Sequence, residues 1–131
     1  MDCIFCKIVK GEIPCYKIYE DENALAFLDI SCDGEGHTLI IPKVHVENIF
    51  DVPKPVLCGV MQAVQKVANH YKELGFDGVN ILNASGESAE QTVMHLHFHI
   101  LPRSKNNTDK LFPNLKKNKL DLAELQKKLK F

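Results

Sequence analysis

The sequence predicts an α+β fold with a largely antiparallel sheet, one long helix and a terminal helix. Four or five short apolar segments end at turn-forming residues, as β-strands do. One long segment has the periodicity of a helix instead. The regular alternation of strands and helices that builds a parallel sheet is missing. The 131 residues suffice for one domain with its own hydrophobic core.

The predicted strands are short and mostly apolar. "HTLIIP" ends at a proline, and "SCDGEG" before it has the composition of a loop, so two strands around this loop form a plausible antiparallel pair. The strand segments are 16–20, 24–30, 37–42, 78–84 and 95–102.

Two helices are expected. Apolar residues recur at steps of three and four from Val56 to Leu74, which places them on one helix face. Asp51 is the expected cap of this helix and Gly75 its end. The segment 119–131 predicts a second amphipathic helix, whose lysines are expected to form the solvated face of a packed helix.

Composition excludes several classes of protein. The formal net charge is −1, from 16 basic and 17 acidic residues, so a nucleic-acid-binding surface is not expected. No apolar run approaches the ~20 residues that span a bilayer, so no membrane segment is expected. The start "MDCIFCK" does not have the pattern of a signal peptide. We therefore expect a cytoplasmic protein.

The five cysteines do not predict a disulfide framework, because their number is odd and no secretion signal is seen. Cys3 and Cys6 form a C-x-x-C pair at the start of the chain, with no strand before it, which disfavours a redox motif. The spacing alone leaves two alternatives open. The pair is either half of a zinc site or two reduced thiols.

Three histidines alternate in "MHLHFHIL", at His95, His97 and His99. On a strand they point to one side, about 6.5–7 Å apart, while Met94, Leu96, Phe98 and Ile100 point to the core. Two functions suit such a row. Either all three rings bind one metal ion, or at least one ring acts as a nucleophile or proton carrier near neutral pH.

The row of histidines resembles the signature of the histidine triad (HIT) family. Further blocks match in the family's order, namely "CIFCKIVKGEIP", "ALAFLDI", "GHTLIIPKVH" and "NASGESAEQTVMHLHFHILPR". The resemblance covers a core of residues 2–103 within a single domain, 1–131, and leaves 104–131 as a C-terminal extension with a helix. It is strongest to the nucleoside phosphoramidase branch and implies a five-stranded antiparallel sheet, usually in a homodimer.

The resemblance implies a hydrolase or transferase acting at the α-phosphate of a purine nucleotide. His97 would attack phosphorus and form a covalent intermediate, and His99 would hold the phosphate oxygens. Gln91 and Thr92 would lie near the phosphate and the leaving group. Glu87 and Glu90 are expected to point to solvent, since a carboxylate facing the phosphate would oppose binding.

The same resemblance implies a nucleotide pocket. Asp29 would accept hydrogen bonds from the ribose hydroxyls, as a carboxylate can. Asn83 would approach the phosphate or the sugar. The base would lie among apolar side chains, as is usual in small-molecule pockets. These are Phe27, Ile30, Phe5 and Ile8.

In many bacterial members of the family, a structural zinc ion is held by two cysteines and two histidines. The matching residues are Cys3, Cys6, His45 and His95, a sound set for tetrahedral zinc. No organic cofactor is expected. His37 is expected to be structural and His70 to lie on the surface.

Other functions remain alternatives. The first alternative is a dinucleoside polyphosphate hydrolase, an enzyme that shares the triad. The second is a nucleotide-binding or interaction protein whose enzymatic activity is incidental. The third is a zinc-dependent hydrolase whose metal ion is bound by the triad itself.

Overall fold

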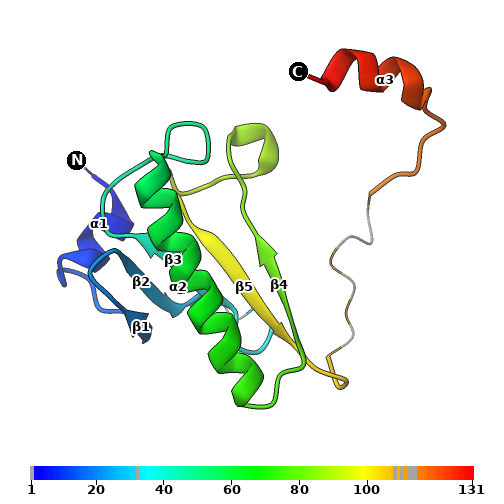
Figure 1. Cartoon of the computed structure of the whole chain (residues 1–131). Helices are drawn as coiled ribbons and strands as arrows, with labels where there is room; N and C mark the ends of the chain where they lie inside the picture. Colours follow the sequence, from blue (N-terminus) through cyan, green and yellow to red (C-terminus); the bar gives the residue numbers. More distant parts are fainter. Residues whose placement is uncertain (1, 32, 108, 110, 112–114) are drawn as a thin grey trace.

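The computed structural model describes residues 2–31, 33–107, 109, 111 and 115–131. Within these residues, five strands form one antiparallel sheet in the order β1-β2-β3-β5-β4 (Figure 1). The predicted sheet is thus confirmed. The strands are β1 (Lys17–Glu20), β2 (Ala24–Leu28), β3 (Thr38–Pro42), β4 (Gly78–Leu82) and β5 (Phe98–Arg103).

The central strands are buried on both faces, which explains their nearly continuous apolar sequence. Ala24, Ala26 and Ile40 belong to the core on one face of the sheet. Leu25 and Phe27 belong to a second core on the opposite face, as the period of two along a strand requires.

Helix α2 (Lys54–Glu73) covers the first face and crosses the sheet diagonally (Figure 1). Its buried side chains include Val60, Val64 and Val67, as the apolar periodicity predicted. The predicted cap was wrong. The helix begins after Pro53, and the Asp51 carboxylate instead accepts backbone hydrogen bonds from residues 47 and 48, at 3.1 and 2.9 Å.

Helix α1 (Ile4–Val9) lies on the other face of the sheet, where the second core is (Figure 1). Phe5 is its buried anchor, and its ring meets that of Phe27 edge-on at 5.6 Å. The Cys3 side chain caps the helix by accepting from the Cys6 backbone N–H. This short helix therefore holds the N-terminal cysteines against the sheet.

The alternating histidines are only partly on a strand, contrary to the prediction. β5 begins at Phe98, so that His95 and His97 lie in the segment before it. The backbone N–H of Leu96 donates to the carbonyl of Val46 outside the sheet ladder. The apolar alternation holds from Leu96 onward but not at Met94, whose side chain is 42% exposed.

The C-terminal helix α3 (Leu122–Leu129) stands apart from the sheet and from α2 (Figure 1). It is shorter than predicted because the Asp121 side chain caps it by accepting from the Glu124 N–H. Its apolar side is not packed as expected, since Leu122 and Leu129 are 73% and 70% exposed. No helix in the described part of the chain is long and apolar enough to cross a bilayer.

Candidate functional site

A cavity of about 340 Å³ opens beside α1 and the histidine segment. This size suits a small ligand. Most of the predicted binding residues line it, together with two of the histidines: Phe5, Ile8, Phe27, Asp29, Ile30, Thr92, His97 and His99. The sequence did not single out the other lining side chains, which are Ile4, Ile13, Pro14, Cys15, Tyr16, Leu28, Leu39 and Val93.

The sheet register fixes the two ends of this cavity. Phe27 pairs with Leu39, and Leu39 pairs with His99. The three side chains therefore form one row across β2, β3 and β5 on the α1 face of the sheet. At about 4.8 Å between strands, an aromatic wall and an imidazole lie about 10 Å apart.

The hydrogen bond of His97 defines its tautomer. Its Nδ1 lies 2.7 Å from the backbone carbonyl oxygen of His95, and a carbonyl can only accept. Nδ1 therefore carries the hydrogen, and Nε2 of a neutral ring is left with a free lone pair. The ring lines the cavity and packs edge-on against Phe5 at 5.2 Å. This is the state that a nucleophilic histidine needs.

His99 stands beside His97, with ring centroids 5.1 Å apart. Its other neighbour is His37, whose Nε2 lies 2.8 Å from His99 Nδ1. Burial, followed by the charges of His97 and His37, lowers the pKa of His99 to about 4. The His99 ring is therefore neutral at neutral pH.

Asp29 lies just after β2 and lines the cavity. Its backbone N–H donates to the carbonyl of His37, and its Oδ1 accepts from the backbone N–H of Ser31 at 2.9 Å. Burial opposes its ionisation. The hydrogen bonds from Ser31 and the charges of His37 and His99 outweigh burial, so the pKa of Asp29 is lowered. The carboxylate is thus charged and can accept hydroxyl donors.

The Gln91 side chain is buried within the loop before the histidines. Its amide nitrogen donates to the carbonyls of Glu47 and Val93, at 2.8 and 3.0 Å. Its amide oxygen accepts from Asn48 and from the backbone N–H of Gly86. All four hydrogen-bonding positions of this buried amide are used. Gln91 therefore braces the loop before the histidines and does not line the cavity.

Asn83 also braces that loop instead of lining the cavity. Its amide nitrogen donates to the backbone carbonyl of His97 at 2.9 Å, and its oxygen accepts from the Ser85 hydroxyl at 2.7 Å. Asn83 thereby holds the backbone that carries His97. Glu87 and Glu90 are exposed, as expected.

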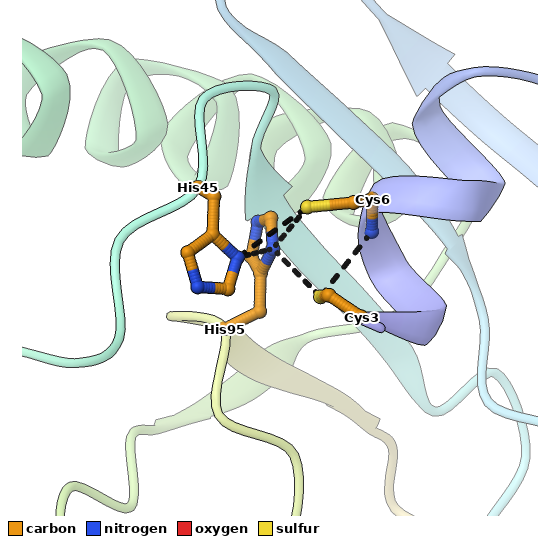
Figure 2. A group of neighbouring side chains, drawn as sticks. All are labelled: Cys3, Cys6, His45 and His95. Atoms are coloured by element: carbon orange, nitrogen blue, oxygen red, sulfur yellow. Dashed lines mark hydrogen bonds between the residues drawn. The ribbon is translucent and has the colours of Figure 1, made fainter. Parts of the chain in front are cut away.

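Next to the cavity, four metal-binding side chains converge on one point (Figure 2). Cys3 and Cys6 reach in from the start of α1, and His45 and His95 meet them from the opposite side. His95 is fully buried, and its Nε2 lies 2.9 Å from the carbonyl of Pro42. Nε2 therefore carries the hydrogen, which leaves Nδ1 bare and facing the other three residues. Burial lowers the pKa of His95, which favours the neutral ring that a metal requires.

The distances in this cluster fit a tetrahedral zinc ion. The sulfur–nitrogen distances are 3.4 Å from Cys3 to His95, 3.4 Å from Cys6 to His45 and 3.6 Å from Cys6 to His95. The two Nδ1 atoms lie 3.2 Å apart. Ligands of tetrahedral zinc are separated by about 3.5 Å (sulfur to nitrogen) and about 3.3 Å (nitrogen to nitrogen). The four side chains can therefore hold one zinc ion with little movement.

The three triad histidines do not form one metal site. The ring of His95 faces the cysteines, whereas the rings of His97 and His99 face the cavity. A second group, formed by Asp29, His37 and His99, also brings donor atoms together. Its two ring nitrogens are only 2.8 Å apart, closer than two ligands of one zinc ion, so they share a hydrogen instead.

Sequence reasoning classified His37 as structural and missed its contact with the triad. The signal was its position directly before β3, the strand that pairs with β5.

The fold and the site together define a small α+β protein with a histidine-lined ligand cavity beside a Cys₂His₂ cluster. A sequence model of the HIT domain matches residues 10–106. The chain belongs to this family.

Proteins of similar sequence and structure are found in archaea, fungi and bacteria. An uncharacterized HIT-like protein of Methanocaldococcus jannaschii is 47% identical over 128 residues, covering 98% of each chain. The adenosine 5′-monophosphoramidase of Schizosaccharomyces pombe is 44% identical, over 79% of this chain and 75% of its own. A zinc-bound histidine triad protein of Mycobacterium smegmatis has 42% identity and a TM-score of 0.79, over 85% of this chain and 81% of that one.

The lowered pKa of His99 predicts how stability depends on pH. The unfolded ring takes up a proton near pH 6.5, but the folded ring does so only near pH 4. The unfolded state therefore binds more protons between these values, and the free energy of unfolding falls as the pH falls through them. Urea titrations at several pH values should give a shallower fall for His99→Gln than for wild type. Above about pH 6.5 the free energy of unfolding should depend on pH in the same way for wild type and His99→Gln. If the two plots of this free energy against pH were also parallel below about pH 6.5, the assignment to His99 would be wrong.

Proposed function

We propose that this protein hydrolyses purine nucleoside phosphoramidates at the α-phosphate through a covalent intermediate on His97. It is a histidine triad enzyme of the hydrolase class. The observation that carries the proposal is the tautomer of His97, which has a bare Nε2 and lines a cavity together with His99 and an ionised Asp29. The phosphoramidase name of the Schizosaccharomyces pombe relative supports this choice of substrate.

The proposed reaction has two displacements at phosphorus. The Nε2 lone pair of His97 attacks the α-phosphorus, the phosphorus–nitrogen bond breaks, and the nitrogen takes a proton from solvent and leaves as the neutral amine. The His95 carbonyl, which accepts from Nδ1, stabilises the positive charge that the ring acquires. Water then attacks phosphorus, the bond from phosphorus to Nε2 breaks, and water's proton returns to solvent as the nucleoside monophosphate and the neutral ring are released.

The other cavity residues bind and orient the nucleotide. His99 donates to a phosphate oxygen, and Asp29 accepts from the ribose hydroxyls. The base packs against Phe27, Ile30, Phe5 and Ile8, and the Thr92 hydroxyl lies at the phosphate end. Gln91 and Asn83 act through the loop backbone that they brace.

Catalysis is tested by measuring release of adenosine monophosphate from adenosine phosphoramidate. His97→Ala should lower kcat by at least about 10³-fold, because it removes the ring whose tautomer the His95 carbonyl fixes with Nε2 bare. His70→Ala, on the exposed side of α2, is the matched control and should retain activity. Equal turnover by wild type and His97→Ala would disprove the nucleophile.

Two alternatives have distinct outcomes in the same assay. Faster turnover of a diadenosine polyphosphate than of the phosphoramidate would identify a dinucleoside polyphosphate hydrolase. Nucleotide binding without turnover of either substrate would identify a nucleotide-binding protein.

We also propose that Cys3, Cys6, His45 and His95 bind a structural zinc ion. The donor geometry and the zinc-bound mycobacterial relative support this. When bound, the ion would fix the ring of His95 and join α1 to the segment before β5. It would take no part in the displacement, since its ligands face away from the cavity lining. No organic cofactor is proposed.

Metal content and stability test the zinc site. Wild type should carry about one zinc per chain by elemental analysis, as a Cys₂His₂ set implies, and Cys6→Ser should lose it. The thermal midpoint of Cys6→Ser should fall by roughly 5 °C or more. Cys58→Ser, which lies outside the cluster, should keep its zinc. Unchanged zinc content in Cys6→Ser would refute the site.

A homodimer is the proposed assembly, with β4 and α2 at the interface. β4 is an edge strand, and Ile81 on it is 45% exposed beside the 38% exposed Met61 of α2. An exposed apolar edge strand is a template for pairing with a second copy. We propose no nucleic-acid or membrane partner. The free Cys3, Cys6, Cys15 and Cys58 fit a reducing compartment, and the cytoplasm is proposed.

The assembly is tested by light scattering after gel filtration. Ile81→Glu should convert the dimer to a monomer, because it places a charge in the interface. Ile18→Glu is the control, since Ile18 lies on β1 at the opposite edge of the sheet and is similarly exposed, at 37%. Equal masses for wild type and both variants would place the interface elsewhere.

A further inference from the structure

His37 lies between the two residues to which we assign binding of the sugar and of the phosphate. On one side its Nε2 is 2.8 Å from His99 Nδ1. On the other side its Nδ1 is 3.7 Å from Asp29 Oδ2, within ion-pair range but too far for a hydrogen bond. This Nδ1 is buried, and it is the one buried side-chain nitrogen or oxygen without a hydrogen-bond partner in the described residues.

The chemistry of these contacts restricts where hydrogens lie. A carboxylate only accepts hydrogen bonds, so the contact between His37 Nδ1 and Asp29 is favourable when Nδ1 carries a hydrogen. The 2.8 Å contact between His37 and His99 needs one further hydrogen between the two nitrogens. Two arrangements satisfy both conditions while His99 stays neutral, as its lowered pKa requires near neutral pH.

In the first arrangement both rings are neutral. His99 donates from Nδ1 to a bare Nε2 of His37, which leaves His99 Nε2 without a hydrogen. That nitrogen would then point its lone pair at an anionic phosphate, which is repulsive.

In the second arrangement the pair carries one additional proton. His37 holds a hydrogen on both nitrogens, forms an ion pair with Asp29 and donates to His99 Nδ1. His99 stays neutral and carries its hydrogen on Nε2, where it can donate to the phosphate. The two arrangements differ by one proton, which solvent supplies.

We propose that binding of the substrate phosphate is coupled to the uptake of one proton by the His37–His99 pair, with Asp29 as the charge that retains it. This inference rests on the proposed function, because it assumes that the phosphate meets His99. The coupling selects ligands by charge, since a neutral ligand in the same cavity gains nothing from the second arrangement.

The charged groups around the pair support this location of the proton. Within the described residues, the titratable groups that contact the pair are Asp29, which follows β2, and His97, which precedes β5. Burial and the neighbouring His97 and His37 lower the pKa of His99, which disfavours an additional proton on the His99 ring. Asp29 is ionised and faces His37.

Calorimetry can count the proton directly. The heat of binding, measured in buffers of different ionisation enthalpy, gives the protons taken up per ligand bound. The ligand is adenosine 5′-methyl phosphate, a diester whose single charge does not change near neutral pH. The protein carries His97→Ala, which removes a second ring that could take up a proton. Uptake should pass through a maximum of at most one proton per ligand as the pH rises, because the free pair loses its additional proton at a lower pH than the pair with the diester bound.

Two comparisons isolate the pair. Adenosine, which lacks the phosphate, should bind without proton uptake. The double variant His37→Gln/His97→Ala should bind the diester with uptake near zero at every pH, because a glutamine amide donates to His99 without an additional proton. Its affinity for adenosine reports whether the pocket is intact.

The outcomes separate this inference from the proposed function. Diester binding with no proton uptake by the His97→Ala protein, or with equal uptake after His37→Gln, would overturn the coupling and leave the nucleotide site standing. Failure of the wild-type protein to bind either ligand would overturn the proposed function itself.

Discussion

The site depends on one hydrogen bond, from Nδ1 of His97 to the backbone carbonyl of His95 at 2.7 Å. It fixes the tautomer of His97, leaves Nε2 bare on a ring that lines the cavity and places a partial negative charge beside Nδ1. A side chain held by the backbone two residues away has little freedom to rotate. The spacing of the two histidines is therefore part of the chemistry, and the backbone around them has to be rigid.

That rigidity comes from contacts on both sides of the segment. The His95 ring is held by the Pro42 carbonyl and faces the Cys₂His₂ cluster, while Asn83 holds the carbonyl of His97. Phe5 of α1 packs edge-on against the rings of His95 and His97, at 5.8 and 5.2 Å. The metal-binding cluster and the cavity thus share a wall, since His95 offers its ring to one and its carbonyl to the other.

Apolar periodicity predicted the five strands and α2. The resemblance to the histidine triad family implied binding roles for Phe27 and Asp29, and both residues line the cavity. The sequence did not predict where β5 begins, since pairing with β3 starts at Phe98 and periodicity does not reveal the partner. The bracing role of Gln91 was also missed. Its four hydrogen bonds reach backbone groups and an asparagine that no local pattern connects to it. Tertiary contacts of this kind are not encoded in residue spacing.

His97 and His99 are close neighbours that resist being charged together, since like charges about 5 Å apart in a partly buried site repel strongly. The structure gives each ring of the triad a different partner for its hydrogen. His95 donates to Pro42, His97 donates to His95, and His99 shares a hydrogen with His37. Two of these partners are carbonyls, which can only accept and so fix the tautomers. The third is a titratable ring beside a carboxylate, so the hydrogen on His99 alone can respond to a ligand.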